Sequence, residues 1–193
     1  YYPFVDECVE IWDQDRISGV RGNHDQVFLD CLIEGTDPST DYQTKYGSSL
    51  NQDRQTFSSS SLSLLQALPT SLTLDFSGLT IALFHGTPWD CLNGRVYPDY
   101  NDWDRFNNVS ADIVLMGHTH YPFTKFHSDK TIINPGSVGQ PRDRSGAACF
   151  ATLELESRLV QHHRIPFDSN RLIEDANKHD PSVPYLVEVL TRK

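Results

Sequence analysis

The sequence lacks any apolar run near the roughly 18 residues needed for a membrane-spanning helix, and it lacks a basic-then-apolar leader. We therefore expect a cytoplasmic protein with no membrane partner. Basic residues are also scarce: 16 Lys and Arg stand against 26 Asp and Glu, giving a net charge of -10. Phosphate backbones demand a basic face, so this balance argues against long nucleic acid as a partner. Small phosphate substrates stay possible, because bound cations would reverse the local field.

Sulfur-containing residues are few as well. Four cysteines are scattered without any Cys-x-x-Cys pair: Cys8, Cys31, Cys91 and Cys149. This spacing argues against a zinc ribbon and favours reduced packing residues, as in cytosolic proteins. The one methionine is Met116, and the chain opens with Tyr1-Tyr2. We therefore expect that the sequence is not a complete reading frame with its initiator retained.

The hydrophobic pattern alternates between strand-like and helix-like segments, and a chain of 193 residues has the length of one domain. Helical periodicity predicts helices over residues 3–12, 26–34, 59–67, 168–178 and 185–190. Short apolar or alternating runs predict strands over residues 17–20, 72–76, 79–84, 113–116, 131–133, 147–155 and 159–165. We expect a polar surface excursion over 36–61 and an aromatic loop over 89–108 that walls a cleft. The fold class predicted is α/β, with a two-sheet β-sandwich flanked by helices.

Three short motifs each follow an apolar run: Gly22-Asn23-His24-Asp25, Phe84-His85-Gly86 and Gly117-His118-Thr119-His120. Neighbouring strands bring such loops to one rim of a sheet, so the three motifs can converge. Neutral imidazole is a good ligand for Zn, Ni, Fe and Mn, and an amide oxygen ligates without adding charge. Two such ions roughly 3.5–4 Å apart activate water and neutralise phosphoryl oxygens. The pattern indicates metal-assisted hydrolysis of a phosphate ester.

Each motif also has a simpler interpretation. A lone histidine such as His85 is more often a satisfied core or loop residue than a ligand, and Gly-His-x-His is short enough to arise by chance. The ordered set of three, each after an apolar run, makes chance the lesser explanation. The remaining histidines lack such a setting and are predicted to lie on the surface or on strand faces: His127, His162, His163 and His179.

The three motifs resemble the calcineurin-like metallophosphoesterase superfamily, in its single-domain bacterial and archaeal phosphodiesterase type. Its signature runs Asp-x-His, Gly-Asp, Gly-Asn-His-Asp, a lone His, then Gly-His-x-His. The resemblance implies an αββα fold and two divalent metal ions, drawn from Mn, Fe, Ni or Zn. It places Asn23, His85 and His118 on the second metal and His120 on the first. His24 would stand over the leaving oxygen as a proton donor, with Asp25 orienting its imidazole.

Residues 134–142, Asn-Pro-Gly-Ser-Val-Gly-Gln-Pro-Arg, resemble a further segment of the same superfamily. The glycines allow close backbone approach, and Pro135 fixes a turn. The fork of Arg142 suits a substrate phosphate, although an ordinary surface ion pair is about as probable a role. The resemblance extends from residue 2 to about 167 and is weakest over 36–61.

The first two signature motifs are absent, since no histidine precedes His24 and nothing before Gly22 matches them. In the superfamily they supply three ligands, including the carboxylate that bridges both metals, so the first metal keeps only His120 here. We expect an amino-terminally incomplete domain, 1–193, that alone holds one metal ion weakly or none and is inactive. A missing amino-terminal segment or partner chain would supply the other ligands.

The predicted function is metal-dependent hydrolysis of phosphate mono- or diesters by a dinuclear centre in the complete enzyme. Small phosphorylated substrates fit the acidic charge better than polymers, and a phosphoprotein is the second choice. The alternative is a non-catalytic scaffold or binding module that keeps the fold, which the absent carboxylates favour. The retained motif residues argue against it: Asn23, His24, Asp25, His85, His118 and His120.

Overall fold

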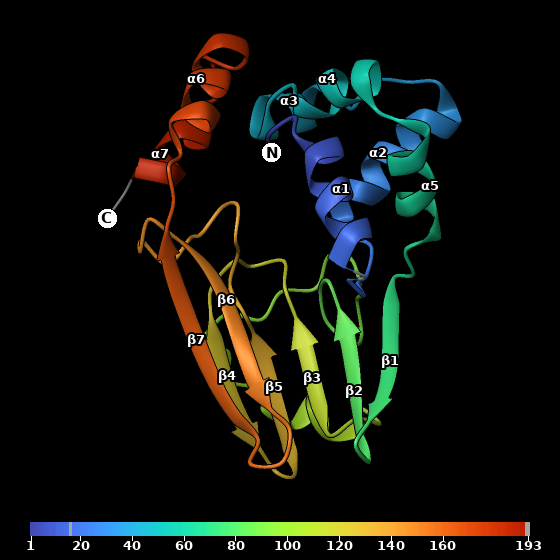
Figure 1. Cartoon of the computed structure of the whole chain (residues 1–193), viewed down its shortest axis with the longest axis vertical. Helices are drawn as coiled ribbons and strands as arrows, with labels where there is room; N and C mark the ends of the chain where they lie inside the picture. Colours follow the sequence, from blue (N-terminus) through green and yellow to red (C-terminus); the bar gives the residue numbers. More distant parts are fainter. Residues whose placement is uncertain (16, 192–193) are drawn as a thin grey trace. The chain divides into compact units, whose positions relative to one another are not determined.

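The computed structural model describes residues 1–15 and 17–191 (Figure 1). Two compact units make up this part of the chain. The helical unit consists of Tyr1–Gly19, Asn23–Leu68 and Asp168–Thr191, and the described sheet unit consists of Val20–Gly22 and Pro69–Phe167. No helix in the described residues is long and apolar enough to cross a membrane.

The sheet unit contains a five-stranded sheet and a two-stranded sheet (Figure 1). The strands of the first, in spatial order, are β1 (Ser71–Phe76), β2 (Leu79–Phe84), β3 (Ile113–Met116), β5 (Lys130–Asn134) and β4 (Phe123–His127). The three central strands β2, β3 and β5 run parallel, while β1 and β4 pair antiparallel at the two edges. The second sheet is an antiparallel pair, β6 (Ala147–Glu154) and β7 (Leu159–Pro166).

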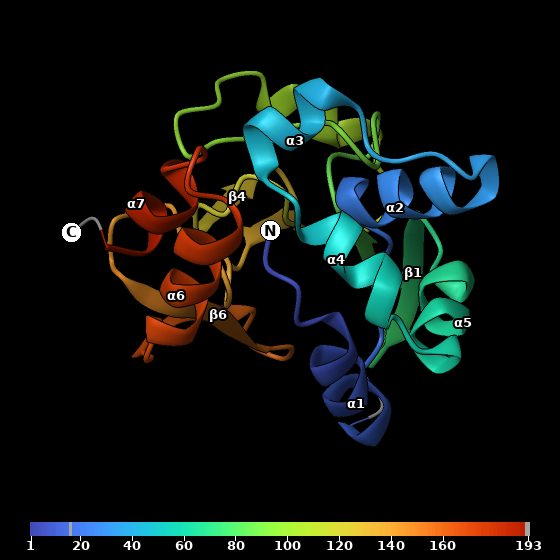
Figure 2. The ribbon, with the colours of Figure 1, turned by 90° about the horizontal axis from the view of Figure 1, so that it is seen from above.

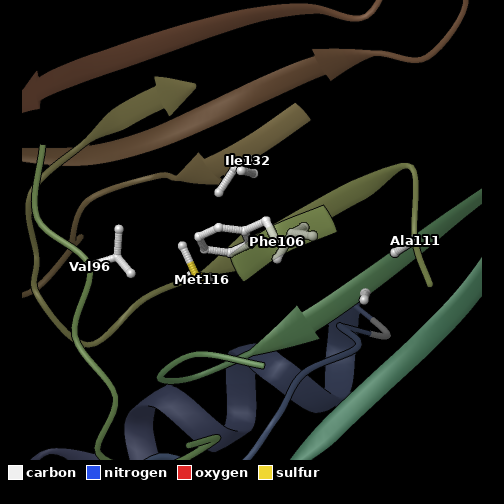
Figure 3. Packing of buried hydrophobic residues seen from close by; sticks show 7 residues of the cluster. Val96, Phe106, Ala111, Met116 and Ile132 are labelled. Carbon is white, nitrogen blue, oxygen red and sulfur yellow. The ribbon is translucent and has the colours of Figure 1, made fainter. Parts of the chain in front are cut away.

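The central strands are covered on both faces, as their continuous apolar sequences require. On one face, Ile113 and its neighbours on β2 and β5 pack against Leu153 and Val160 of the second sheet. On the other face, Val114 and its neighbours pack against the segment that ends in the 3-10 helix η1 (Trp103–Asn108). Figure 3 shows the fully buried Phe106 ring of η1 beside Met116 and Ile132. The two-sheet α/β class predicted from the sequence is confirmed.

The edge strand β1 is less covered than the strands beside it. Its residues Leu72, Leu74 and Phe76 pair with the β2 residues that face the second sheet, so they share that face. Leu74 and Phe76 are nevertheless exposed. The β1–β2 turn matches its sequence signal: Ser77 and Gly78 both have positive φ, 53° and 79°, as a two-residue hairpin turn requires.

Most predicted strands are present with small shifts in their ends, but two differences matter. Strand β4 was not predicted, because Phe-Thr-Lys-Phe-His lacks clean apolar alternation; β4 is set by its antiparallel pairing with β5. The predicted strand over 17–20 was wrong: these residues form no ladder with any described strand. A strand requires a neighbouring backbone, and apolar residues alone do not supply one. Nearby, the Arg21 amide donates to the Pro69 carbonyl at 2.7 Å.

The helical unit contains seven helices in the part of the chain that is described. They are α1 (Val5–Asp15), α2 (Asn23–Glu34), α3 (Thr40–Tyr46), α4 (Ser49–Thr56), α5 (Ser59–Ala67), α6 (Asn170–His179) and α7 (Tyr185–Thr191). Helices α2, α4 and α5 lie close together in Figure 2, and they bury a common cluster of Phe28, Leu29, Leu50 and Leu65. The predicted helices are confirmed, with α2 starting three residues earlier than expected. Asn23, His24 and Asp25 therefore occupy the first helical turn and are not in a loop.

The polar segment 36–61 was predicted as a surface excursion with a helix only from about residue 59. Most of its residues are exposed or half-buried, as expected, but it also forms α3 and α4, which were not predicted. Serines cap two of its helices. The Tyr42 amide donates to Ser39 Oγ at 3.2 Å at the start of α3, which ends at Gly47 with φ 83°. Ser58 caps α5 in the same way, accepting from the Ser61 amide.

The aromatic loop over 89–108 was predicted to wall a cleft, and Trp89, Arg105 and Asn108 do line a surface pocket together with Pro88 and Val109. Trp89, Tyr100 and Trp103 pack against the buried cluster on the outer face of the five-stranded sheet. Their rings cover this hydrophobic cluster.

Candidate metal and phosphate site

Two of the predicted ligands follow strands that end at the same edge of the sheet. His85 comes directly after β2, and Gly117-His118 comes directly after β3. Phe84 and Met116 are register partners in these parallel strands, so the next residues lie beside each other. The Gly117 amide donates to the His85 carbonyl at 3.0 Å, which extends the ladder by one step. Carboxyl ends of parallel strands are where ligands bind in open α/β sheets.

The imidazoles of His85 and His118 are in direct contact. His85 Nε2 lies 2.9 Å from His118 Nδ1, with the ring centroids 4.8 Å apart. Burial lowers the pKa of His85 to about 4 and that of His118 to about 3. Both rings are therefore neutral near pH 7, which is the form that binds a metal.

The buried Nε2 of His118 has no hydrogen-bond partner among the described residues. A neutral imidazole offers one donor and one acceptor, so the pair with His85 satisfies only one of its nitrogens. Leaving such a group unpaired costs roughly 1–3 kcal/mol, so a water or an ion is expected to meet it. The His85–His118 pair thus fits a transition-metal ion such as Zn or Ni, which prefers imidazole nitrogen.

His120 is held in one orientation by the backbone. Its Nδ1 lies 2.8 Å from the Gln140 carbonyl oxygen, so Nδ1–H donates and the lone pair stands on Nε2. A hydrogen bond of this kind fixes the tautomer of metal-binding histidines. Burial, followed by the Arg142 charge, lowers the pKa of His120 to about 4. The assignment of the neutral His120 as a metal ligand through Nε2 stays a prediction.

Both histidines of this loop have a left-handed backbone, with φ 61° at His118 and 64° at His120. Such residues cost free energy and persist where the surroundings hold them. The restraint here is the fully buried Asn134 at the end of β5. Its Nδ2 donates to the Gly117 carbonyl at 2.7 Å and to Thr119 Oγ1 at 3.0 Å, while its Oδ1 accepts from the Gly136 amide. Asn134 therefore ties the histidine loop to the segment that follows β5.

Arg142 lies beside the same loop. Its amide donates to the His120 carbonyl at 3.4 Å, and its Nη2 donates to Gln140 Oε1 at 3.1 Å. A guanidinium near the histidine loop is compatible with the predicted contact to a substrate phosphate. That role stays a prediction.

Asn23, His24 and Asp25 lie in the first turn of α2, in the helical unit. The predicted meeting of Asn23 with His85 and His118 joins residues of different units and stays a prediction. Within the helical unit, His24 Nδ1 is hydrogen-bonded to the Tyr42 hydroxyl, and His24 Nε2 lies 3.0 Å from the Tyr1 hydroxyl. The expected role of Asp25 in orienting His24 likewise stays a prediction.

The other histidines have ordinary partners. On the strands, His127 Nε2 lies 3.0 Å from Asp104, and His162 Nε2 lies 2.8 Å from Thr124 Oγ1. His163 pairs with Thr152, while His179 lies 3.9 Å from Asp175. In the residues that the structure describes, no group of three or more His, Cys, Asp or Glu side chains is gathered for a metal ion. The four cysteines are free thiols.

Comparison with known families shows the superfamily of the chain. The model of the calcineurin-like phosphoesterase superfamily domain matches residues 2–158. The chain belongs to this superfamily. A curated uncharacterised protein of Methanocaldococcus jannaschii is 30% identical over 194 residues, covering 90% of this chain and 74% of the relative. A probable metallophosphoesterase of Methanothermobacter thermautotrophicus is 31% identical over 78 residues, covering 38% and 40%.

Solved structures show the same phosphoesterase fold. A hypothetical protein of Pyrococcus horikoshii superposes with a TM-score of 0.80 at 19% identity, covering 99% of this chain and 80% of that one. A metallophosphoesterase of Sphaerobacter thermophilus superposes with a TM-score of 0.74 at 22% identity, covering 96% and 81%. At these identities the likeness establishes the shared α/β architecture.

Two residues that hold the site in place, Asn134 and Gln140, were not recognised from the sequence as positioning residues. Both are buried polar residues, and both lie in the segment that resembles the superfamily. The available signal for Asn134 was a polar side chain directly after a fully buried strand, but sequence does not reveal which groups it would bond. The Gln140 contact to His120 uses a backbone carbonyl, which any residue possesses.

Replacing Asn134 with alanine should destabilise the protein by about 2–4 kcal/mol, because it leaves the Gly117 carbonyl and the Gly136 amide without their partner. Urea unfolding followed by circular dichroism measures this change. Asn93→Ala is the matched control, since Asn93 is exposed, and surface changes usually stay within about 0.5 kcal/mol. Equal unfolding free energies for the two variants would contradict the role of Asn134.

The metal-free protein should lose stability as pH falls from 6.5 towards 4. Unfolded imidazoles take up protons near pH 6.5, whereas the folded pKa values of His85, His118 and His120 are about 4, 3 and 4. The unfolded state therefore binds more protons in this window, so the free energy of unfolding rises with pH. The measurement is urea unfolding in the presence of a chelator at several pH values.

His118→Gln provides the control for this pH effect. Burial raises the pKa of Asp53 to about 7. This carboxyl makes the free energy of unfolding fall with pH, and it does so equally in the wild type and in His118→Gln. The difference between the two slopes isolates the imidazole and should reach at most about 1.4 kcal/mol per pH unit. Parallel profiles for wild type and variant would refute the assignment.

Proposed function

We propose that the protein hydrolyses phosphate esters at a dinuclear metal centre, with Asn23, His85 and His118 on one ion and His120 on the other. The observation that carries this proposal is the contact of His85 Nε2 with His118 Nδ1 at 2.9 Å, at the carboxyl edge of the parallel strands. Membership of the calcineurin-like phosphoesterase superfamily supports ester hydrolysis as the reaction class. Small phosphorylated molecules are the substrates that agree best with the charge of -10.

In this proposal each side chain has one task. When bound, the two divalent ions supply Lewis acidity and a water that is nucleophilic near neutral pH. His120 keeps its lone pair on Nε2 because Nδ1–H donates to Gln140. Arg142 binds a phosphoryl oxygen through its guanidinium. Water attacks phosphorus in line, the bond to the leaving oxygen breaks, and His24 Nε2–H gives its proton to that oxygen.

The remaining ligands belong to the two signature motifs that this sequence lacks. We propose that a preceding segment or a partner chain supplies them, including the bridging carboxylate. Without them His120 is left as the only assigned ligand of its ion, and Zn or Ni would be held weakly through imidazole nitrogen. This chain alone is then expected to bind one ion or none and to be inactive.

Hydrolysis of a chromogenic phosphodiester with Mn or Ni tests the function directly. The chain is assayed alone and together with a segment that carries the Asp-x-His and Gly-Asp motifs of a full-length relative. We expect turnover only in the second case, because the bridging carboxylate is then present. Two stoichiometric metals found in the isolated chain by elemental analysis would contradict the proposed ligand set.

A non-catalytic scaffold is the second candidate. It is favoured by the absence, among the described side chains, of any group of three His, Cys, Asp or Glu residues able to hold an ion. Inactivity that persists when the segment is present would establish the scaffold. The retained motif residues argue for the enzyme: Asn23, His24, Asp25, His85, His118 and His120.

His24→Gln in the active, ligand-complete enzyme should lower kcat by about 10²–10⁴-fold, the range for loss of a general acid. Metal affinity should change little, since His24 is not assigned as a ligand. Steady-state kinetics and a metal titration separate the two effects. His179→Gln is the control, because His179 is exposed at the end of α6. A His24 variant that loses metal and turnover in parallel would show that His24 is a ligand.

A further inference from the structure

Three tyrosine rings surround His24 in the helical unit. The ring centroids of Tyr1, Tyr46 and Tyr42 lie 4.6, 4.8 and 5.4 Å from the His24 centroid. Tyr42 and Tyr46 are four residues apart on α3, so they lie on one side of that helix, and their own rings are 4.9 Å apart. Two of the three rings around His24, those of Tyr42 and Tyr46, therefore come from the segment 36–61.

Only one of the two α3 tyrosines bonds the imidazole through its hydroxyl. The Tyr42 hydroxyl is hydrogen-bonded to His24 Nδ1. The Tyr46 hydroxyl has no hydrogen-bond partner in the described part of the chain, and its ring meets His24 edge-on at 88°. The two residues thus offer matched ring contacts but different polar contacts.

The position of Tyr42 is set by more than this bond. Its ring packs on the cluster around Phe28 and Leu50, and its own amide is capped by Ser39. Burial raises the pKa of the Tyr42 hydroxyl above its ordinary value, so the phenol stays protonated. A phenol oxygen both donates and accepts, so it can bond Nδ1 whether or not that nitrogen carries a proton.

We propose that Tyr42 is a positioning residue that holds the His24 imidazole through Nδ1. The other ring nitrogen, Nε2, lies 3.0 Å from the Tyr1 hydroxyl, and the leaving oxygen takes the place of that hydroxyl at Nε2. This inference rests on the proposed function of His24 as proton donor. The proton moves from His24 Nε2 to the leaving oxygen as the phosphorus–oxygen bond breaks, and the Tyr42 bond to Nδ1 persists through the transfer. Tyr42 itself does not touch the substrate.

The proposal predicts that loss of the Tyr42 hydroxyl lowers kcat by different factors for two kinds of diester. A nitrophenolate leaving group departs without protonation, whereas an alkoxide needs a proton from a well-placed acid. In the metal-loaded, ligand-complete enzyme, Tyr42→Phe should lower kcat for an alkyl diester by about 10-fold or more, part of the general-acid contribution. The nitrophenyl diester should slow by less than about 3-fold, since it draws little on that contribution. KM should stay nearly constant for both, because the ring and its packing are retained.

Tyr46→Phe is the matched control, and its ratio of alkyl to nitrophenyl turnover should equal that of the wild type. An equal loss on both substrates in Tyr42→Phe would overturn the proposal, because it would indicate a structural role. The same ratio change in both tyrosine variants would also overturn it.

A second measurement separates this inference from the proposed function. In the metal-free chain, the ¹⁵N resonance of His24 Nδ1 should shift in Tyr42→Phe and stay in place in Tyr46→Phe. If the wild type hydrolyses neither ester, the proposed function fails, and the NMR result still decides whether Tyr42 holds the ring. An unshifted Nδ1 resonance in Tyr42→Phe overturns the contact itself.

Discussion

The register of two parallel strands is the constraint on which the candidate site depends. Phe84 is paired with Met116, so the residues that follow β2 and β3 lie side by side. This pairing by itself brings the imidazoles of His85 and His118 into contact. A slip of one residue in this pairing would turn every side chain of β3 to the opposite face. The alternating burial of Ile113 and Val114 against two different clusters opposes such a slip. Core packing therefore specifies the position of the polar residues.

The site itself is a polar network in an apolar setting. Asn134 satisfies three backbone or side-chain partners at once, and Gln140 fixes His120 through its carbonyl. A buried hydrogen-bond network in which every polar group is paired holds its side chains rigidly, whereas an unpaired polar group in such a network lowers the free energy of unfolding. In this network the Nε2 of His118 lacks a partner among the described residues. The side-chain Nε2 of Gln140 in the same network also lacks one, so the unmet bonding capacity is shared between the two residues.

Sequence reasoning recovered the elements that depend on local pattern. Continuous apolar runs predicted β3 and β5, the Ser77-Gly78 turn predicted the β1–β2 hairpin, and helical periodicity predicted α1 and α6. Elements that depend on pairing with another strand were not predicted correctly. Strand β4 is fixed by its pairing with β5, and the segment 17–20 fails to be a strand for want of a neighbour. For the site, the sequence supplied the candidate residues, of which the structure brings His85 and His118 together. The contacts of Asn134 and Tyr42 required the fold.

The left-handed backbone at His118 and His120 limits which residues these two positions accept. Valine, isoleucine and threonine are penalised there, whereas glycine, asparagine and aspartate adopt this conformation more readily. Two of those tolerated side chains offer oxygen in place of nitrogen, and oxygen donors favour harder ions such as Mn or Mg. In the proposed metal site, single exchanges at these two positions would therefore shift the preference between ions while the loop keeps its length.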